Sequence, residues 1–160
     1  MSQGETGTVD TGGTFKIYPP ALAGLLLLAG LLLHLTAGHH RHFVYSHQLL
    51  GLLLVAGGAG LMFYAAALFA ARDTTKNPYG EPTALVASAP YTFTRNPMYV
   101  GLATVLLGFA VFFGSPVMLL APIVFVFVID RVVIPQEEKT LERLFGQRYL
   151  DYKARVRRWL

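Results

Sequence analysis

The sequence predicts an all-α, polytopic membrane protein with about four transmembrane helices, the last two forming a tight hairpin, followed by a cytoplasmic amphipathic helical region at the C-terminus. The 160-residue chain is 54% hydrophobic, with a mean hydropathy of +0.49, which is too apolar for a soluble domain of this length. Its apolar residues form four long segments, and its Lys and Arg residues concentrate near the C-terminus. The chain contains no Cys, which excludes disulfides, thiolate metal sites and a cysteine nucleophile.

The N-terminal part of the chain divides into a polar tail and two long apolar segments. Met1–Phe15 is rich in Gly, Thr and Ser and lacks a basic region before an apolar core, so we predict a disordered tail rather than a secretory signal. Residues 16–160 then form a single membrane domain. Tyr18–Ala37 and His47–Ala71 are each long enough to span a hydrocarbon core of about 30 Å.

The second apolar segment contains four glycines among small residues: Gly51, Gly57, Gly58 and Gly60. Glycines on a membrane helix allow a neighbouring helix to approach closely. Ordinary membrane-helix composition is the alternative explanation.

The third and fourth apolar segments, Met98–Phe113 and Val117–Ile134, are at the short end of the spanning range of about 17–25 residues. Only Gly114-Ser115-Pro116 separates them. A turn-forming Gly followed by a helix-starting Pro predicts a tight antiparallel hairpin.

A helical region is predicted after the last apolar segment. Pro135 can begin a helix that carries Glu137 and Glu138 in its first turn, and Gly146 can end it. Further on, four apolar and aromatic residues recur at helical spacing among Lys and Arg: Tyr149, Tyr152, Val156 and Trp159. This pattern predicts an amphipathic helix that lies on the membrane or packs across the hairpin.

The distribution of Lys and Arg predicts the orientation. The loop after the second segment contains Arg72, Lys76 and Arg95, and seven Lys and Arg residues follow Glu138, whereas the loop Gly38–Ser46 contains only Arg41. Because cytoplasmic loops are enriched in Lys and Arg, we expect both termini in the cytoplasm.

A polar cluster lies at the entrance of the third segment: Tyr91, Arg95, Asn96, Pro97, Tyr99 and Gly101. The guanidinium could hold a carboxylate or phosphate, the amide could recognise the edge of a ring, and the tyrosines could stack on a ring or face a cation. The proline would set the entry angle of the helix, and the glycine would permit close approach. The alternative is an ordinary membrane interface with a snorkelling arginine and an aromatic belt.

Three further groups of polar residues could carry chemistry. Glu137-Glu138 could bind an ammonium group, or could simply favour the start of a helix. Asp130-Arg131, at the end of the last apolar segment, is costly unless it is paired or faces a cavity, and an intramembrane salt bridge is the alternative. Four histidines have neither structural-zinc spacing nor a nearby carboxylate, so no metal site is expected: His39, His40, His42 and His47.

Five short motifs occur in order along the C-terminal half: Leu85–Tyr91, Arg95–Gly101, Ile134–Glu138, Leu141–Gly146 and Tyr149–Trp159. Together they resemble the integral-membrane methyltransferases of the isoprenylcysteine carboxyl methyltransferase and phospholipid methyltransferase superfamily. The resemblance covers Thr83–Leu160. The chain departs from the usual pattern at Asn96, where the superfamily has His, and at Ala89, where it has Gly.

The resemblance implies S-adenosylmethionine as cofactor, bound between the cytoplasmic ends of the hairpin and the C-terminal helix. It implies a pocket formed by Arg95, Asn96, Pro97 and Tyr99 and completed by the Glu137-Glu138 pair. It also implies methyl transfer to a small or lipophilic acceptor at the cytoplasmic membrane face, with membrane lipids as partners and no nucleic acid. The identity of the acceptor stays open.

Two catalytic roles are expected. Glu138 would face the ammonium group of the ligand, and Arg131 would face the acceptor or steady its nucleophilic atom. Two alternative functions stay open: an NADPH-dependent membrane reductase related to sterol reductases, and a non-enzymatic scaffold or transporter subunit.

Overall fold

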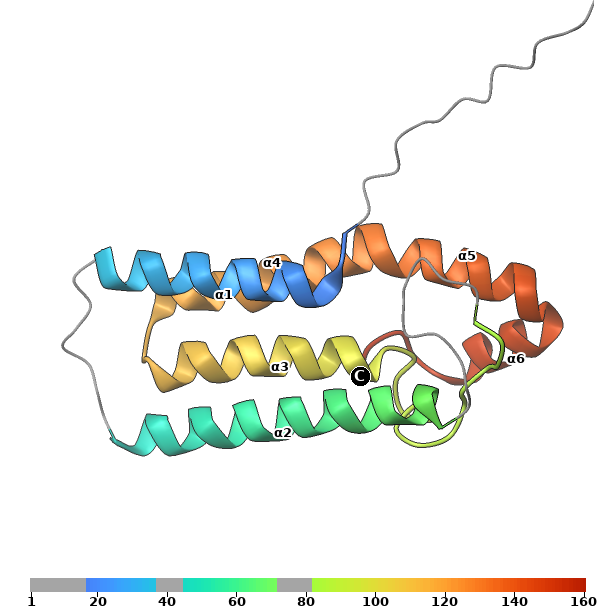
Figure 1. The fold of residues 1–160 in the computed structure, drawn as a ribbon, viewed down its shortest axis with the longest axis horizontal. Coiled ribbons are helices and arrows are strands. Elements are labelled where there is room, and N and C mark those ends of the chain that lie inside the picture. The colour runs from blue at the N-terminus through green and yellow to red at the C-terminus, as the bar shows by residue number, and fades with distance from the viewer. Residues whose placement is uncertain (1–16, 37–44, 72–81) are drawn as a thin grey trace, which may run out of the picture.

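The computed structural model describes residues 17–36, 45–71 and 82–160. The tail Met1–Phe15 and three of the four histidines, His39, His40 and His42, lie outside these ranges. In Figure 1, α1 (Pro19–Thr36), α2 (Tyr45–Ala70), α3 (Pro97–Phe112) and α4 (Leu120–Val128) lie lengthwise beside one another. The first residues of α1, the last of α2 and the first of α3 lie at the end of the bundle where α5 (Ile134–Phe145) and α6 (Gln147–Arg155) are found.

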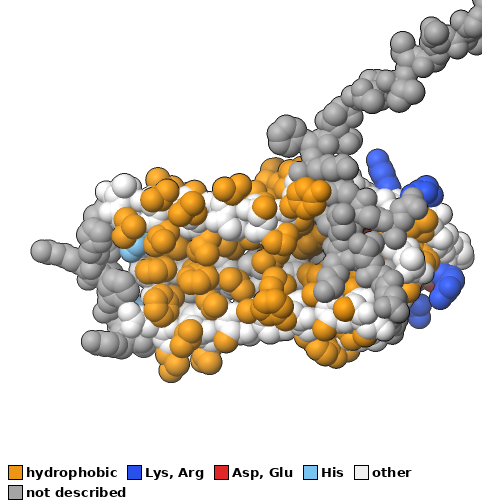
Figure 2. Space-filling view, in the orientation of Figure 1, with side chains coloured by type: hydrophobic (Ala, Val, Ile, Leu, Met, Phe, Trp, Pro, Cys, Tyr) orange, Lys and Arg blue, Asp and Glu red, His pale blue; other side chains and the backbone are white. Residues whose placement is uncertain are grey.

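The helices have the length and composition of membrane spans. Three of them, Pro19–Thr36, His47–Ala70 and Pro116–Phe145, are long and apolar enough to cross a membrane. The fourth, α3, is apolar but has only 16 residues. Hydrophobic side chains cover the face of the bundle that Figure 2 presents, and Lys and Arg side chains appear at the α5–α6 end. This all-helical arrangement confirms the predicted polytopic membrane architecture.

Helices α2 and α3 approach each other through glycines. A Cβ added to Gly58 would lie 2.7 Å from the carbonyl oxygen of Gly101, and a Cβ on Gly51 would lie 2.5 Å from the backbone nitrogen of Phe112. A Cβ on Gly57 or Gly60 would have no heavy atom within 4 Å. Two of the four glycines therefore make the expected close contact, because only one face of α2 meets α3.

The main hydrophobic core lies where α1, α3 and the last long helix meet. Phe125, Ile129 and Val133 are fully buried there, packed with Tyr99 of α3 and Ala23 of α1. Tyr99 belongs both to this core and to the polar cluster at the start of α3, so the two are in contact. Packing of the bundle thus holds one wall of the candidate site in place.

The predicted hairpin is confirmed. Gly114 has a φ of 57°, a conformation that glycine adopts without a steric penalty. After Ser115, a single 3₁₀ turn over Pro116–Leu119, η1, leads directly into α4.

The helix predicted to start at Pro135 is α5, which has this proline in its first turn, but no break separates it from the span before it. Helix α4 continues through a π-helical turn, η2 (Ile129–Val133), into α5. The N–H of Ile134 donates to the carbonyl of Ile129, five residues earlier. Proline lacks an N–H and clashes with the carbonyl four residues before it in a regular α-helix, and a wider turn accommodates this defect. One helix therefore runs from the apolar span to the acidic pair.

The predicted amphipathic helix through Trp159 was too long. Gly146, with a φ of 51°, separates α5 from α6 as expected for a cap. Helix α6 ends at Arg155, and Val156 is already extended, with φ −116° and ψ 133°. Trp159 packs against the main core rather than continuing a helical face.

Candidate functional site

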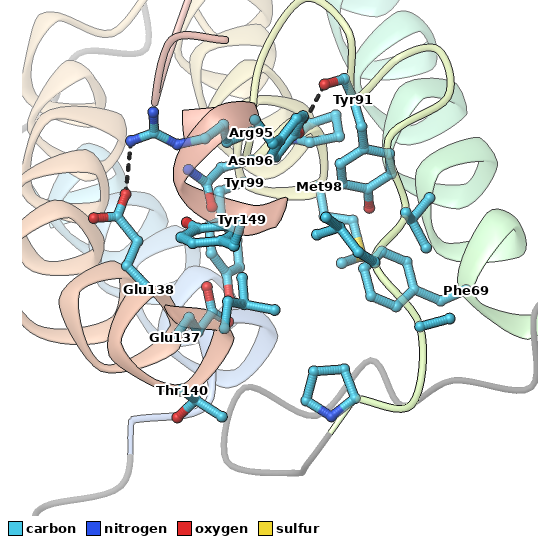
Figure 3. A pocket seen from close by; sticks show the side chains of 17 residues that line it. Phe69, Tyr91, Arg95, Asn96, Met98, Tyr99, Glu137, Glu138, Thr140 and Tyr149 are labelled. Carbon is cyan, nitrogen blue, oxygen red and sulfur yellow. Dashed lines mark hydrogen bonds and ion pairs between the residues drawn. The ribbon is translucent and has the colours of Figure 1, made fainter. Parts of the chain in front are cut away.

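A pocket opens at the end of the bundle where α2, α3, α5 and α6 meet. Its cavity volume is about 110 Å³. Polar groups of the lining are Arg95, Asn96, Glu137, Glu138 and Thr140, and its apolar groups include Phe69, Leu85, Val86, Met98 and Leu141. In Figure 3, Glu138 and Phe69 lie on opposite sides of the pocket. The cavity thus has one charged wall and one apolar wall.

Arg95 ties three parts of the pocket together. Its Nη2 donates to Oε1 of Glu138 at 2.8 Å, the ion pair drawn in Figure 3. Its Nη1 donates to the carbonyls of Lys153 at 2.9 Å and Val156 at 2.7 Å, which lie at the C-terminal end of α6, where a cation is favoured. Its Nε is buried without a hydrogen-bond partner among the described residues.

Glu138 is surrounded by cations. Only 8% of its side chain is exposed, and Arg95, Lys153 and Arg158 pair with its two oxygens at 2.8–3.3 Å. A buried carboxylate is stable only when it is paired in this way. The first role of Glu138 in this structure is therefore to hold α5, α6 and the residue before α3 together.

Glu137 has a different environment. Its Oε1 accepts a hydrogen bond from the Tyr99 hydroxyl at 2.5 Å. Among the described residues no Lys or Arg pairs with it. Of the two acids, Glu137 is the one that no Lys or Arg of the described residues pairs with.

Three buried tyrosines, Tyr91, Tyr149 and Tyr152, also line the pocket. The hydroxyl of Tyr152 donates to the carbonyl of Tyr91 at 2.7 Å, and the hydroxyl of Tyr91 donates to the carbonyl of Ala65 on α2 at 3.4 Å. Burial raises the pKa of Tyr152 to about 12 and raises the pKa values of Tyr91 and Tyr149 still further. These phenols are therefore neutral near pH 7. The rings of Tyr149 and Tyr152 lie against each other, with centroids 6.1 Å apart, whereas the ring of Tyr91 packs against Phe69 on the apolar wall.

Asn96 and Pro97 lie at the start of α3, as the sequence indicated. The side-chain nitrogen of Asn96 donates to the carbonyl of Arg158 at 2.9 Å, so this amide is engaged with the C-terminal residues. Pro97 is buried in the first turn of the helix and lines the pocket.

Two predicted site residues do not line the pocket. A Cβ on Gly101 would lie 2.6 Å from the carbonyl oxygen of Gly58, so its close approach is to α2 and not to a ligand. The side chain of Arg131 is 70% exposed, 3.6 Å from Asp130 and against the ring of Phe127. Arg131 lies in the π-helical turn and is not among the residues that line the cavity with Glu137 and Glu138.

The sequence interpretation missed the contribution of the C-terminal residues. Arg158 contacts Glu138 and Asp130, and Trp159 donates to Asp130 at 2.8 Å. The helical spacing of Tyr149 and Tyr152 predicts an amphipathic face, whereas both residues line the pocket. An unpaired carboxylate near the end of a membrane span is energetically costly, so the position of Asp130 in the sequence already indicated that it has a cationic partner.

Comparisons with known proteins identify relatives of this chain. The family model described as phospholipid methyltransferase matches residues 46–148. An uncharacterized protein of Haemophilus influenzae is 41% identical over 63 residues, which is 39% of this chain and 100% of that protein. The protein-S-isoprenylcysteine O-methyltransferases of Mus musculus and Homo sapiens are 35% and 33% identical over 112 and 110 residues, in each case 66% of this chain and 38% of the relative.

The chain thus spans 38% of the length of these two mammalian enzymes. No solved structure matches the chain significantly. The family match favours the methyltransferase interpretation over the reductase and scaffold alternatives. Since the matched region covers α2 to α5 and most of the pocket, this integral membrane protein belongs to the phospholipid methyltransferase family.

Proposed function

We propose that this protein transfers a methyl group from S-adenosylmethionine to a small or lipophilic acceptor at the cytoplasmic face of the membrane. The observation that carries the proposal is the pocket with one charged and aromatic wall and one apolar wall, at the end of a membrane bundle. Its charged and aromatic wall suits a ligand with an amino-acid group and a ring. Its apolar wall suits an acceptor that arrives from the lipid.

The residues of the pocket fit this cofactor. Glu137 can pair with the ammonium group, because its charge has no cationic partner among the described residues. The buried, unpartnered Nε of Arg95 is a donor for a carboxylate. The rings of Tyr91, Tyr99 and Tyr149 can contact the adenine ring or the sulfonium. The charged side of the pocket is supported by the bond from Asn96 to the carbonyl of Arg158, by Pro97 in the first turn of α3, and by the ion pair of Glu138 with Arg95.

S-adenosylmethionine, when bound, supplies an activated methyl group. The protein then has to align the acceptor and exclude water, and a strong acid or base is of secondary importance. Phe69, Met98 and Leu141 provide an apolar surface beside the charged wall, which disfavours water at the reacting centre. Arg131, which lies outside the pocket lining, is not required in this scheme.

The acceptor is proposed from the same apolar wall. The two mammalian relatives are named for methylation of S-isoprenylcysteine, and the family is named for phospholipids. A prenyl chain and an acyl chain share the chemistry that Phe69, Leu85 and Val86 could bind. The acceptor is therefore best described as a molecule with a long hydrocarbon chain and a polar end that is methylated.

The test uses purified protein in lipid nanodiscs. Calorimetry should detect S-adenosylhomocysteine binding at micromolar concentration, and S-adenosylmethionine with a labelled methyl group should label a component of a lipid extract. Heat-inactivated protein is the control. Absence of both binding and labelling would refute the proposed function, and label in a water-soluble component alone would refute the lipophilic acceptor.

We also propose that both termini face the cytoplasm. Seven Lys and Arg residues follow Glu138, and Lys and Arg side chains appear at the α5–α6 end of the bundle in Figure 2. This is the distribution that the positive-inside rule describes. A C-terminal fusion to green fluorescent protein should fluoresce, whereas a fusion to alkaline phosphatase should be inactive. The opposite pair of results would reverse the orientation.

A further inference from the structure

The last five residues, 156–160, form an irregular segment that lies against the residues just before α3. The N–H of Arg95 donates to the carbonyl of Arg157 at 2.8 Å. The carbonyl of Arg158 accepts from Oγ1 of Thr94 at 3.1 Å and from Nδ2 of Asn96 at 2.9 Å. These bonds join the C-terminal segment to the polar cluster before α3.

The side chain of Arg158 joins two carboxylates of the long helix. Its Nε and Nη2 donate to the two oxygens of Glu138 at 3.1 Å and 2.8 Å, a forked arrangement. Its Nη1 donates to Oδ1 of Asp130 at 3.2 Å, and the indole of Trp159 donates to the same oxygen at 2.8 Å. Forked bonds between a guanidinium and a carboxylate are strong and directional.

The two carboxylates lie on either side of the irregularity in the helix. Asp130 is in the π-helical turn, and Glu138 is one turn inside α5. A π-helical turn adds a residue to the turn, so the direction of every side chain beyond it depends on how the turn is held. Arg158 spans this turn and thereby limits the rotation of α5 relative to α4.

We propose that Arg158 is a positioning residue for the ammonium-binding acid of the pocket. By bridging Asp130 and Glu138, it sets the rotation of α5 and keeps Glu138 occupied, so that Glu137 is the carboxylate presented to the ligand. Arg158 does not itself line the pocket, and it acts only through α5. This inference rests on the proposed function, since it concerns recognition of the amino group of the cofactor.

The test compares two ligands that differ in the amino-acid group. S-adenosylhomocysteine has the group, and 5′-methylthioadenosine lacks it. In nanodiscs, Arg158→Gln should raise the Kd for S-adenosylhomocysteine about tenfold and leave the Kd for 5′-methylthioadenosine unchanged, because the acid that is displaced contacts only the amino group. Arg157→Gln is the matched control. It removes the same charge from the neighbouring residue, whose side chain is exposed, and neither Kd should change.

A second variant keeps the test informative if Arg158→Gln does not fold. Asp130→Asn retains an oxygen that can accept from Trp159 but weakens the bond to Arg158, and it should produce the same selective loss to a smaller extent. An equal loss for both ligands, or none, in folded variants would overturn the inference and indicate that Arg158 only fastens the C-terminal segment. Failure of the wild-type protein to bind either ligand would instead refute the proposed function.

Discussion

Glu137→Gln is expected to weaken binding of S-adenosylhomocysteine by about 10- to 150-fold, the equivalent of a charge-assisted hydrogen bond of about 1.5–3 kcal/mol. The substitution keeps an oxygen that can accept from Tyr99, whose hydroxyl lies 2.5 Å from Glu137, so the pocket should keep its shape. Only the negative charge offered to the ammonium group is lost. Calorimetry in nanodiscs measures the effect, and 5′-methylthioadenosine should bind unchanged.

Two further variants on the same helix, Glu142→Gln and Glu138→Gln, are the controls for this prediction. Glu142→Gln removes a carboxylate that pairs with Lys153 outside the pocket lining, and it should leave ligand binding intact. Glu138→Gln removes the partner of Arg95 and Arg158 and should lower thermal stability and affect both ligands. A selective loss of S-adenosylhomocysteine binding in Glu138→Gln, with Glu137→Gln silent, would return the ammonium-binding role to Glu138, as the sequence had indicated.

Gly58→Ala is expected to lower the free energy of unfolding by about 1–3 kcal/mol, the usual cost of forcing a methyl group into a packed contact. The new Cβ would lie 2.7 Å from the carbonyl oxygen of Gly101 and 2.9 Å from the backbone nitrogen of Val105. Both atoms belong to the backbone of α3, so no flexible side chain can yield. Because α2 carries Phe69 and α3 carries Tyr99, a shift between the helices should also weaken ligand binding. Unfolding by SDS in mixed micelles measures the stability.

Gly57→Ala is the matched control, since a Cβ at this neighbouring position has no heavy atom within 4 Å. It should be neutral, or stabilising by up to about 1 kcal/mol through helix propensity. If both substitutions destabilise the protein equally, their effects do not come from the contact between α2 and α3.

The sequence alone determined where the membrane helices lie and which short stretches carry the polar chemistry. The predicted spans Tyr18–Ala37 and His47–Ala71 agree closely with α1 (Pro19–Thr36) and α2 (Tyr45–Ala70). Such limits follow from hydropathy, a local property, because a polar residue in hydrocarbon is unfavourable wherever the rest of the chain lies. The tight turn of the hairpin is also predicted locally, because it depends on the positive φ of Gly114, which a glycine adopts readily.

The tertiary structure decided how these elements continue and which charges meet. Pro135 gave a local signal for a helix start, but the preceding π-helical turn allows one helix to continue through it. Helical spacing extended to Trp159, but this residue leaves the helix because Asp130 and the core offer it a better partner. Arg95 and Glu138 were expected to bind a ligand, and they bind each other. Residues 43 positions apart can be paired only by packing, since no local pattern records which of several cations a buried carboxylate will meet.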